Sequence, residues 1–260
     1  FLISYAFLEK GLQAIYSKYG FLIYPIAIKA TGAKAVYANE IGYKASVENI
    51  LKKCNSKTRI CFIANPNNPT GTYLTIKEIR KLRENLPKKC LLVVDSAYSE
   101  YVIEKDYSDS ISYAKKREDI IVTHTFSKIY GIPSLRLGWA YCPENIVSVL
   151  NKIRPAFNIN SYAQQIGKIV LEDQKYLEKS IRHNLYWKNW LELQFKELNL
   201  TVVKGVANFI LLNLKNRFIT NHYVKYLEKE NIIIRKLDSY KLENCVRISI
   251  GLEKENRELI

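Results

Sequence analysis

The stretch DIIVTHTFSKIYGIPSLRLG, residues 119–138, decides the fold. Its opening residues, 119–122, read as a buried strand, and Lys128 lies just past the end of that strand. In open α/β sheets, ligands bind beyond the carboxyl ends of the strands. A lysine that is desolvated or placed near other cations loses its proton more readily, and the neutral amine attacks carbonyl groups. The stretch therefore predicts an α/β fold with a reactive lysine at the carboxyl edge of the sheet.

Three side chains near this lysine could bind a dianionic phosphate: Thr125, Ser127 and Arg136. Hydroxyl and guanidinium groups are suited to phosphate oxygens. A Ser-Lys pair alone carries little information, so the weight comes from its position after a strand and from the arginine. A lysine beside a phosphate clamp suggests pyridoxal phosphate as the cofactor.

Strands and helices alternate through the first half of the chain. Buried or half-buried strands are expected at 12–16, 34–38, 58–64, 90–95, 119–123 and 138–142. Helices are expected at 1–10, 21–33, 46–52 and 75–86, the last of which begins with a capping box of Thr75 and Glu78. Such alternation predicts a mostly parallel sheet flanked by helices.

The pattern changes beyond Pro143. Helices are expected at 143–153, 160–199 and 220–230, and short strands at 200–203, 208–214, 232–235 and 245–250. Long helices followed by a small sheet predict a smaller C-terminal α+β domain. We therefore expect a large domain over residues 1–159 and a small domain over residues 160–260.

The composition excludes several classes of protein. The chain has 260 residues and a formal net charge of +15, but its lysines are scattered, which favours general lysine-rich usage over a nucleic-acid surface. Its five cysteines and three histidines show no metal-ligand spacing, so we expect no metal and a reduced, cytoplasmic chain. No apolar run approaches the roughly 18 residues of a membrane span, so no membrane partner is expected.

Three further fragments carry chemistry. The turn-rich run Asn65–Gly71 follows a buried strand and would hold an asparagine amide at a fixed angle, whereas a lone Asn-Pro pair would be an ordinary turn. Asp95 ends a strand without a charged neighbour, so it is either a helix N-cap or the partner of a cation. Arg247 lies among strand-forming apolar residues, so it binds either a structural carboxylate or a substrate carboxylate.

Taken in this order and at these separations, the four fragments resemble the fold type I pyridoxal-phosphate aminotransferases, and most of all the histidinol-phosphate aminotransferases. The resemblance covers nearly the whole chain. Its most similar stretches are residues 19–25, 64–72, 95–101, 125–141, 207–209 and 232–251.

The resemblance implies roles for individual residues of the cofactor site. Lys128 would bind pyridoxal 5'-phosphate covalently and then move the proton of the substrate. Asp95 would pair with the ring nitrogen, and Phe21 would stack on the ring face. The ring's phenolic oxygen would accept hydrogen bonds from Asn68 and Tyr98. The cofactor phosphate would be bound by Thr125, Ser127 and Arg136.

The resemblance also implies partners. Arg247 would bind the carboxylate of the amino donor, Arg235 would face the substrate phosphate, and Asn208 would lie near the substrate. The expected reaction is transamination between histidinol phosphate and 2-oxoglutarate, by a homodimer when the protein is full length. An aromatic amino-acid aminotransferase, a phosphothreonine decarboxylase and a non-catalytic remnant remain alternatives.

The chain departs from the family pattern at a few positions. Ser96 stands where the family usually has glutamate, residues 132–134 are poorer in glycine and alanine, and Lys241 stands where glycine is common. Phe1 falls just after the family's glycine-serine-aspartate segment, so the chain resembles a member without its N-terminal quarter. We expect residues 1–260 alone to bind the cofactor weakly.

Overall fold

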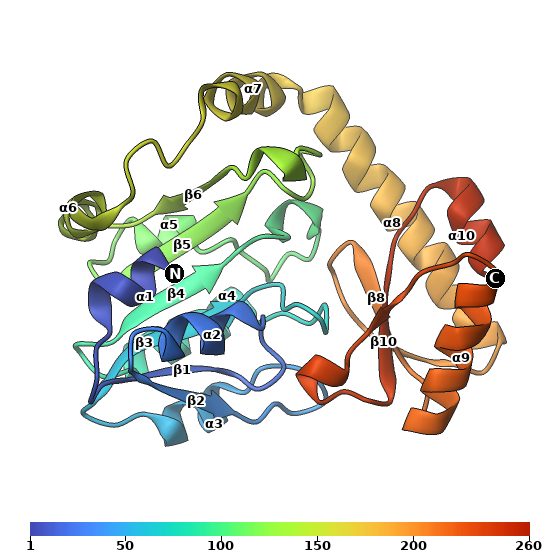
Figure 1. The fold of residues 1–260 in the computed structure, drawn as a ribbon, viewed down its shortest axis with the longest axis horizontal. Helices are drawn as coiled ribbons and strands as arrows, with labels where there is room; N and C mark the ends of the chain where they lie inside the picture. The colour runs from blue at the N-terminus through green and yellow to red at the C-terminus, as the bar shows by residue number, and fades with distance from the viewer.

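The structure is a computed structural model that describes all of residues 1–260 and contains two β-sheets (Figure 1). The first sheet has six strands in the order β2-β1-β3-β4-β5-β6. Their bounds are β1 Gln13–Ser17, β2 Lys34–Ala38, β3 Thr58–Ala64, β4 Leu91–Asp95, β5 Ile120–Thr125 and β6 Gly138–Tyr141. All neighbours run parallel except β5 and β6, which are antiparallel. The predicted mostly parallel sheet is confirmed.

Helices cover both faces of this sheet because its central strands are apolar on both sides. One face packs on α3 Val47–Lys53, α4 Ile76–Asn85 and α5 Ile111–Ala114, and the other on α1 Leu2–Phe7, α2 Ile23–Lys29 and α6 Glu144–Ile153. Within β5, Ile120 and Val122 belong to the first of these clusters and Ile121 to the second. This period-two alternation is what a two-sided strand requires.

The second sheet is antiparallel, with four strands in the order β7-β8-β10-β9. Its strands are β7 Thr201–Val203, β8 Phe209–Asn213, β9 Arg235–Lys236 and β10 Cys245–Ser249. The helices around it are α8 Gln174–Glu197, α9 Arg217–Lys229 and α10 Glu253–Leu259. In Figure 1, α8 runs from the end of α7 (Ser161–Glu172), above the first sheet, down to the second sheet. A smaller α+β unit is thus present, while the boundary at residue 160 stays a prediction.

The C-terminal half differs from expectation in three places. The helix predicted over 160–199 is two helices, because Asp173 interrupts it and its side chain accepts a hydrogen bond from the backbone N–H of Tyr176, 2.9 Å away. The strand predicted at 232–235 is wrong for its first three residues: the N–H of Ile232 donates to the carbonyl of Leu227 and closes the end of α9, so pairing with β10 begins only at Arg235. Helix α10 was not predicted, because its segment is polar.

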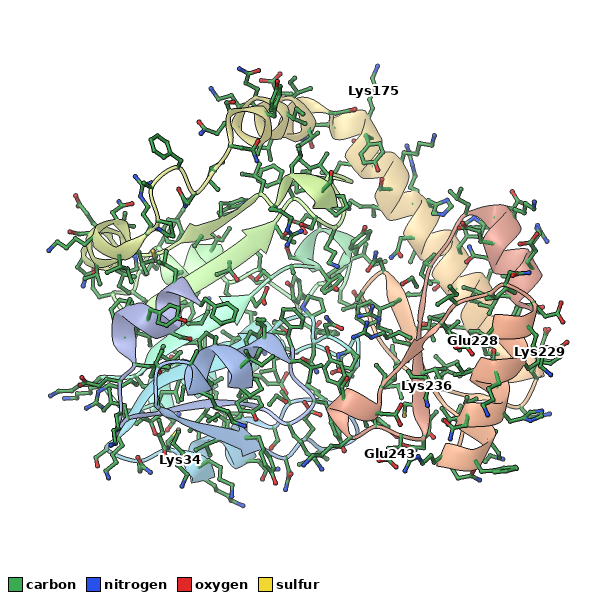
Figure 2. The ribbon with its side chains drawn as sticks, viewed as in Figure 1. Lys34, Lys175, Glu228, Lys229, Lys236 and Glu243 are labelled. Atoms are coloured by element: carbon green, nitrogen blue, oxygen red, sulfur yellow. The ribbon has the colours of Figure 1, made fainter.

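The surface charge is dispersed. Lys34, Lys175 and Lys229, from β2, α8 and α9, project in different directions from well-separated parts of the molecule (Figure 2). None of the helices is both long enough and apolar enough to cross a membrane.

Candidate active site

The candidate active site lies where three neighbouring parallel strands end. Strands β3, β4 and β5 are adjacent in the sheet, and the residues that follow them, or end them, include Asn68, Asp95 and Lys128. Parallel strands place their carboxyl ends at the same edge, about 4.8 Å apart from strand to strand. The sheet therefore brings together residues that lie up to 60 positions apart in the sequence.

A cavity of about 460 Å³ at this edge collects ten of the eleven predicted site residues. They are Phe21, Asn68, Asp95, Tyr98, Thr125, Ser127, Lys128, Arg136, Arg235 and Arg247. The eleventh, Asn208, lines a separate cavity of about 440 Å³ together with Tyr101, Asn184 and His183. The structure therefore does not bring Asn208 together with the other ten.

Asp95 ends β4 as a half-buried carboxylate without an ion-pair partner. The hydroxyl of Tyr24 donates a hydrogen bond to its Oδ2 at 2.8 Å. Burial raises the pKa of Asp95, and hydrogen bonds from Tyr24, the Ala97 N–H and Thr123 oppose the shift. The N-cap alternative does not hold, because the following 3₁₀ helix, Ser99–Tyr101, has Tyr98 at its N-cap. A cation placed against Asp95 would offset the cost of its burial.

The surroundings of Lys128 disfavour its charged form. Burial lowers its pKa, and the nearby charges of Arg247 and Arg136 lower it further. Its Nζ lies 5.2 Å from the centre of the Tyr98 ring. Burial raises the pKa of Tyr98 to about 12, so this phenol keeps its proton and can donate a hydrogen bond. Both shifts suit a site in which an amine attacks a carbonyl.

The three predicted phosphate-binding residues are in contact with one another. The N–H of Ser127 donates to Thr125 Oγ1 at 3.1 Å, and Arg136 Nη1 lies 3.4 Å from Ser127 Oγ. Arg136 also donates to the carbonyl of Pro133 at 2.6 Å, which fixes its guanidinium over the loop. Two hydroxyls and one guanidinium thus converge from the loop that follows β5.

Arg247 projects from the second sheet toward the first. Its Nη1 donates to Asn68 Oδ1 at 2.6 Å, and its guanidinium lies 4.9 Å from the centre of the Phe209 ring. It makes no salt bridge, so the structural ion-pair alternative does not hold. Its buried Nε has no hydrogen-bond partner, so one donor of this guanidinium is unsatisfied.

Sequence reasoning missed two residues of the site. Tyr24, which bonds Asp95, lies three positions after Phe21 in the stretch 19–25 and stacks on Phe62 with ring centres 5.1 Å apart. Tyr240 lines the cavity from the second sheet's side. The spacing from Phe21 could have indicated Tyr24, since α2 begins between them; nothing local marked Tyr240.

The residues present fit pyridoxal phosphate. A half-buried carboxylate without a countercharge suits a pyridinium nitrogen, and a pair of hydroxyls with an arginine suits a phosphate. Lys128 lies in the same cavity with a lowered pKa.

Known proteins are similar to this chain in sequence and in fold. The family model for aminotransferase class I and II matches residues 1–260, so the chain belongs to this family. Histidinol-phosphate aminotransferases of Maricaulis maris and Paramagnetospirillum magneticum are 41% and 42% identical to it over 261 residues. The alignments cover 100% of this chain and 72% of each relative.

Solved structures agree at the level of the fold. The histidinol-phosphate aminotransferase of Sinorhizobium meliloti, in complex with pyridoxal-5'-phosphate, superposes with a TM-score of 0.93 at 23% identity, covering 99% of this chain and 71% of that one. Aspartate aminotransferase from Thermus thermophilus with maleate gives 0.88 at 18% identity, over the same shares of the two chains. At these identities the superpositions establish the fold alone.

Proposed function

We propose that this protein transfers the amino group of histidinol phosphate to 2-oxoglutarate, with pyridoxal phosphate as cofactor. The observation that carries the proposal is the single cavity in which Lys128, Asp95 and the clamp of Thr125, Ser127 and Arg136 meet two further arginines. The 41–42% identity to histidinol-phosphate aminotransferases supports the choice of substrate.

When bound, the cofactor supplies an electron sink that acidifies the Cα proton of the substrate amine. Lys128 would hold the cofactor and, with its Nζ, would move that proton. The charge of Asp95 keeps the ring nitrogen protonated, and Tyr24 fixes the carboxylate by its 2.8 Å hydrogen bond. Phe21 covers one face of the ring. Asn68 and Tyr98 donate to its phenolic oxygen.

The two arginines of the second sheet bind the anionic ends of the substrates. Arg247 takes the α-carboxylate of glutamate, with its planar fork held by Asn68. Arg235, paired with Arg247 across β9 and β10, takes the phosphate of histidinol phosphate. Phe209 packs on both Tyr98 and Arg247, whereas its neighbour Asn208 lines the separate cavity.

We further propose a cytoplasmic homodimer. Exposed apolar side chains between α6 and the end of α7 support a surface that a second subunit covers: Phe157 is 97% exposed, Tyr162 73% and Ile169 65%. The five cysteines are all free, as a reducing compartment requires.

The cofactor is tested by titrating the protein with pyridoxal phosphate. Pyridoxal phosphate should produce the visible absorbance band of a lysine-bound cofactor in the wild type and none in Lys128→Ala. A wild-type protein without this band would refute the assignment, including its alternative as an aromatic aminotransferase.

The substrate is tested by comparing kcat/KM for histidinol phosphate and phenylalanine. Histidinol phosphate should be preferred, and Arg235→Ala should reduce its kcat/KM by roughly 10-fold or more, the cost of one charge-assisted contact. Phenylalanine, which has no phosphate, should change by less than about twofold. Equal losses on both substrates would show that Arg235 does not read the phosphate.

A further inference from the structure

Tyr240 is a cavity residue without an assigned role. It ends the 3₁₀ helix Asp238–Tyr240 and is 6% exposed. Its ring packs in an apolar cluster with Leu211, Leu237, Leu242 and Cys245, and its remaining surface faces the active-site cavity. The phenol is therefore held rigidly, with only its cavity side open.

Its hydroxyl lies near two guanidinium groups, one backbone N–H and the phenols of Tyr24 and Tyr98. The backbone N–H of Leu22 is directed at the phenolic oxygen, and the guanidinium groups of Arg247 and Arg235 act on it from the second sheet. Burial outweighs these influences and raises the pKa of Tyr240, so the hydroxyl keeps its proton. The Tyr240 hydroxyl donates to no protein acceptor, so beside two guanidinium groups it has a hydrogen to give to a ligand.

We propose that Tyr240 donates its O–H to an anionic oxygen of the bound substrate, at the point between Arg235 and Arg247. Tyr240 then determines specificity together with the two arginines, because its hydroxyl adds a hydrogen bond to the anion that they do not supply. This inference rests on the proposed function, because it takes the anion to be the phosphate of histidinol phosphate or a carboxylate of glutamate.

This arrangement favours anionic substrates, because the Tyr240 hydroxyl is left unpaired when a substrate has no anionic oxygen. A neutral substrate offers the O–H of Tyr240 no anionic acceptor, and an unpaired buried polar group lowers affinity for that substrate. An anionic oxygen completes the hydrogen bonding of the phenol and of both guanidinium groups together. Because the ring is packed, this geometry is already formed before the substrate arrives.

The test is Tyr240→Phe, which removes the donor and keeps the ring in its cluster. Tyr43→Phe is the matched control, since Tyr43 packs against the same cluster but its hydroxyl bonds Asn213, outside the cavity. We expect KM to rise about 10-fold for at least one anionic substrate in Tyr240→Phe, with kcat within about twofold, as for loss of one bond to a charged group. Tyr43→Phe should leave both KM values within about twofold.

Separate half-reactions identify the anion. A rise confined to histidinol phosphate assigns the hydroxyl to the phosphate, and a rise confined to glutamate assigns it to the carboxylate. Histidinol, which lacks the phosphate, should not be affected by Tyr240→Phe; an equal loss with histidinol, or unchanged KM for both anions, overturns the inference. If the wild type rejects histidinol phosphate yet transaminates glutamate, the proposed substrate fails, and the glutamate half-reaction still decides the role of Tyr240.

Discussion

At the scale of single residues, the site uses burial to set charge. Asp95 and Lys128 both lie in the cavity, and burial moves the pKa of each toward its neutral form. In the proposed site, a protonated ring nitrogen would favour the ionised form of Asp95, and the lowered pKa of Lys128 would favour its neutral amine. The free site thus lacks a positive charge against Asp95, and a bound pyridinium would supply it.

Glu40 gives a residue-scale prediction about pH. Burial raises its pKa to about 7, against hydrogen bonds from Ser17 and from the N–H of Tyr19 and the charge of Lys18. Between about pH 4.5 and pH 7 the folded state therefore holds a proton that the unfolded chain has lost, so stability falls as pH rises through this window. Glu40→Gln should remove that dependence.

The measurement is chemical unfolding at pH 5 and pH 8. Relative to wild type, Glu40→Gln should gain stability between the two values, by about 1 to 3 kcal/mol. Glu48→Gln is the control, because its carboxylate is exposed and its salt bridge with Lys81 is on the surface. A wild type and a Glu40→Gln variant with parallel pH profiles would exclude Glu40 as a titrating buried acid.

The residue roles were partly readable in the sequence. Lys128, Asp95 and Asn68 stand directly after strands, and strand ends are local signals. Tyr240 and the separation of Asn208 into another cavity were not readable, because both depend on how the second sheet meets the first. Distances across that junction are set by packing between distant segments rather than by local pattern.

At the scale of elements, α4 shows how a local signal can be read in full. Thr75 caps the helix by accepting from the N–H of Glu78, and the Glu78 side chain accepts from the N–H of Thr75, as the sequence predicted. Glu78 also binds Lys44, so the cap joins α4 to the loop before α3. By contrast, β9 could not be placed, because its register follows from β10 and from the turn that ends α9.

Thr75→Ala should therefore lower the free energy of unfolding by about 1 kcal/mol, the usual cost of an N-cap. Urea unfolding monitored by circular dichroism measures this. Lys77→Ala, on the exposed side of the same helix, should change the stability by less than about half that amount. No difference between the two variants would mean that the capping box does not stabilise α4.

At the scale of the whole molecule, the two sheets meet at a pair of glycines. The N–H of Val206 donates to the carbonyl of Gly71 at 2.8 Å, which joins the loop after β3 to the segment before β8. Gly71 has a φ of +73°, and a Cβ on Gly205 would lie 3.0 Å from the Cα of Gly71. Backbone meets backbone here without room for a methyl group.

Gly205→Ala should push the second sheet away from the first. We expect KM for both substrates to rise on the order of 10-fold, because Arg235 and Arg247 are displaced from the cofactor. Cofactor affinity should stay within about twofold, since its ligands lie on the first sheet. Lys204→Ala, an exposed neighbour, serves as control; a loss of cofactor affinity equal to the rise in KM would contradict a displacement of the second sheet alone.

The fold class could be predicted because strand and helix periodicities are local and strong. Alternating strands and helices predicted the parallel sheet, and the C-terminal pattern predicted a smaller α+β unit. The break at Asp173 and the short β9 escaped prediction, since polar helices and edge strands carry weak patterns. The feature that could least be predicted from the sequence is the junction between the two sheets.

At that junction, cofactor binding and substrate binding are assigned to two different parts of the sequence. The residues that we propose for the cofactor come from the first sheet and its loops, whereas Arg235, Tyr240 and Arg247 come from one short segment, residues 235–247. Exchange of that segment between family members is therefore a route to new amine donors with the proton chemistry left unchanged. The substrate preference of the enzyme can therefore be changed by substitutions within residues 235–247 alone.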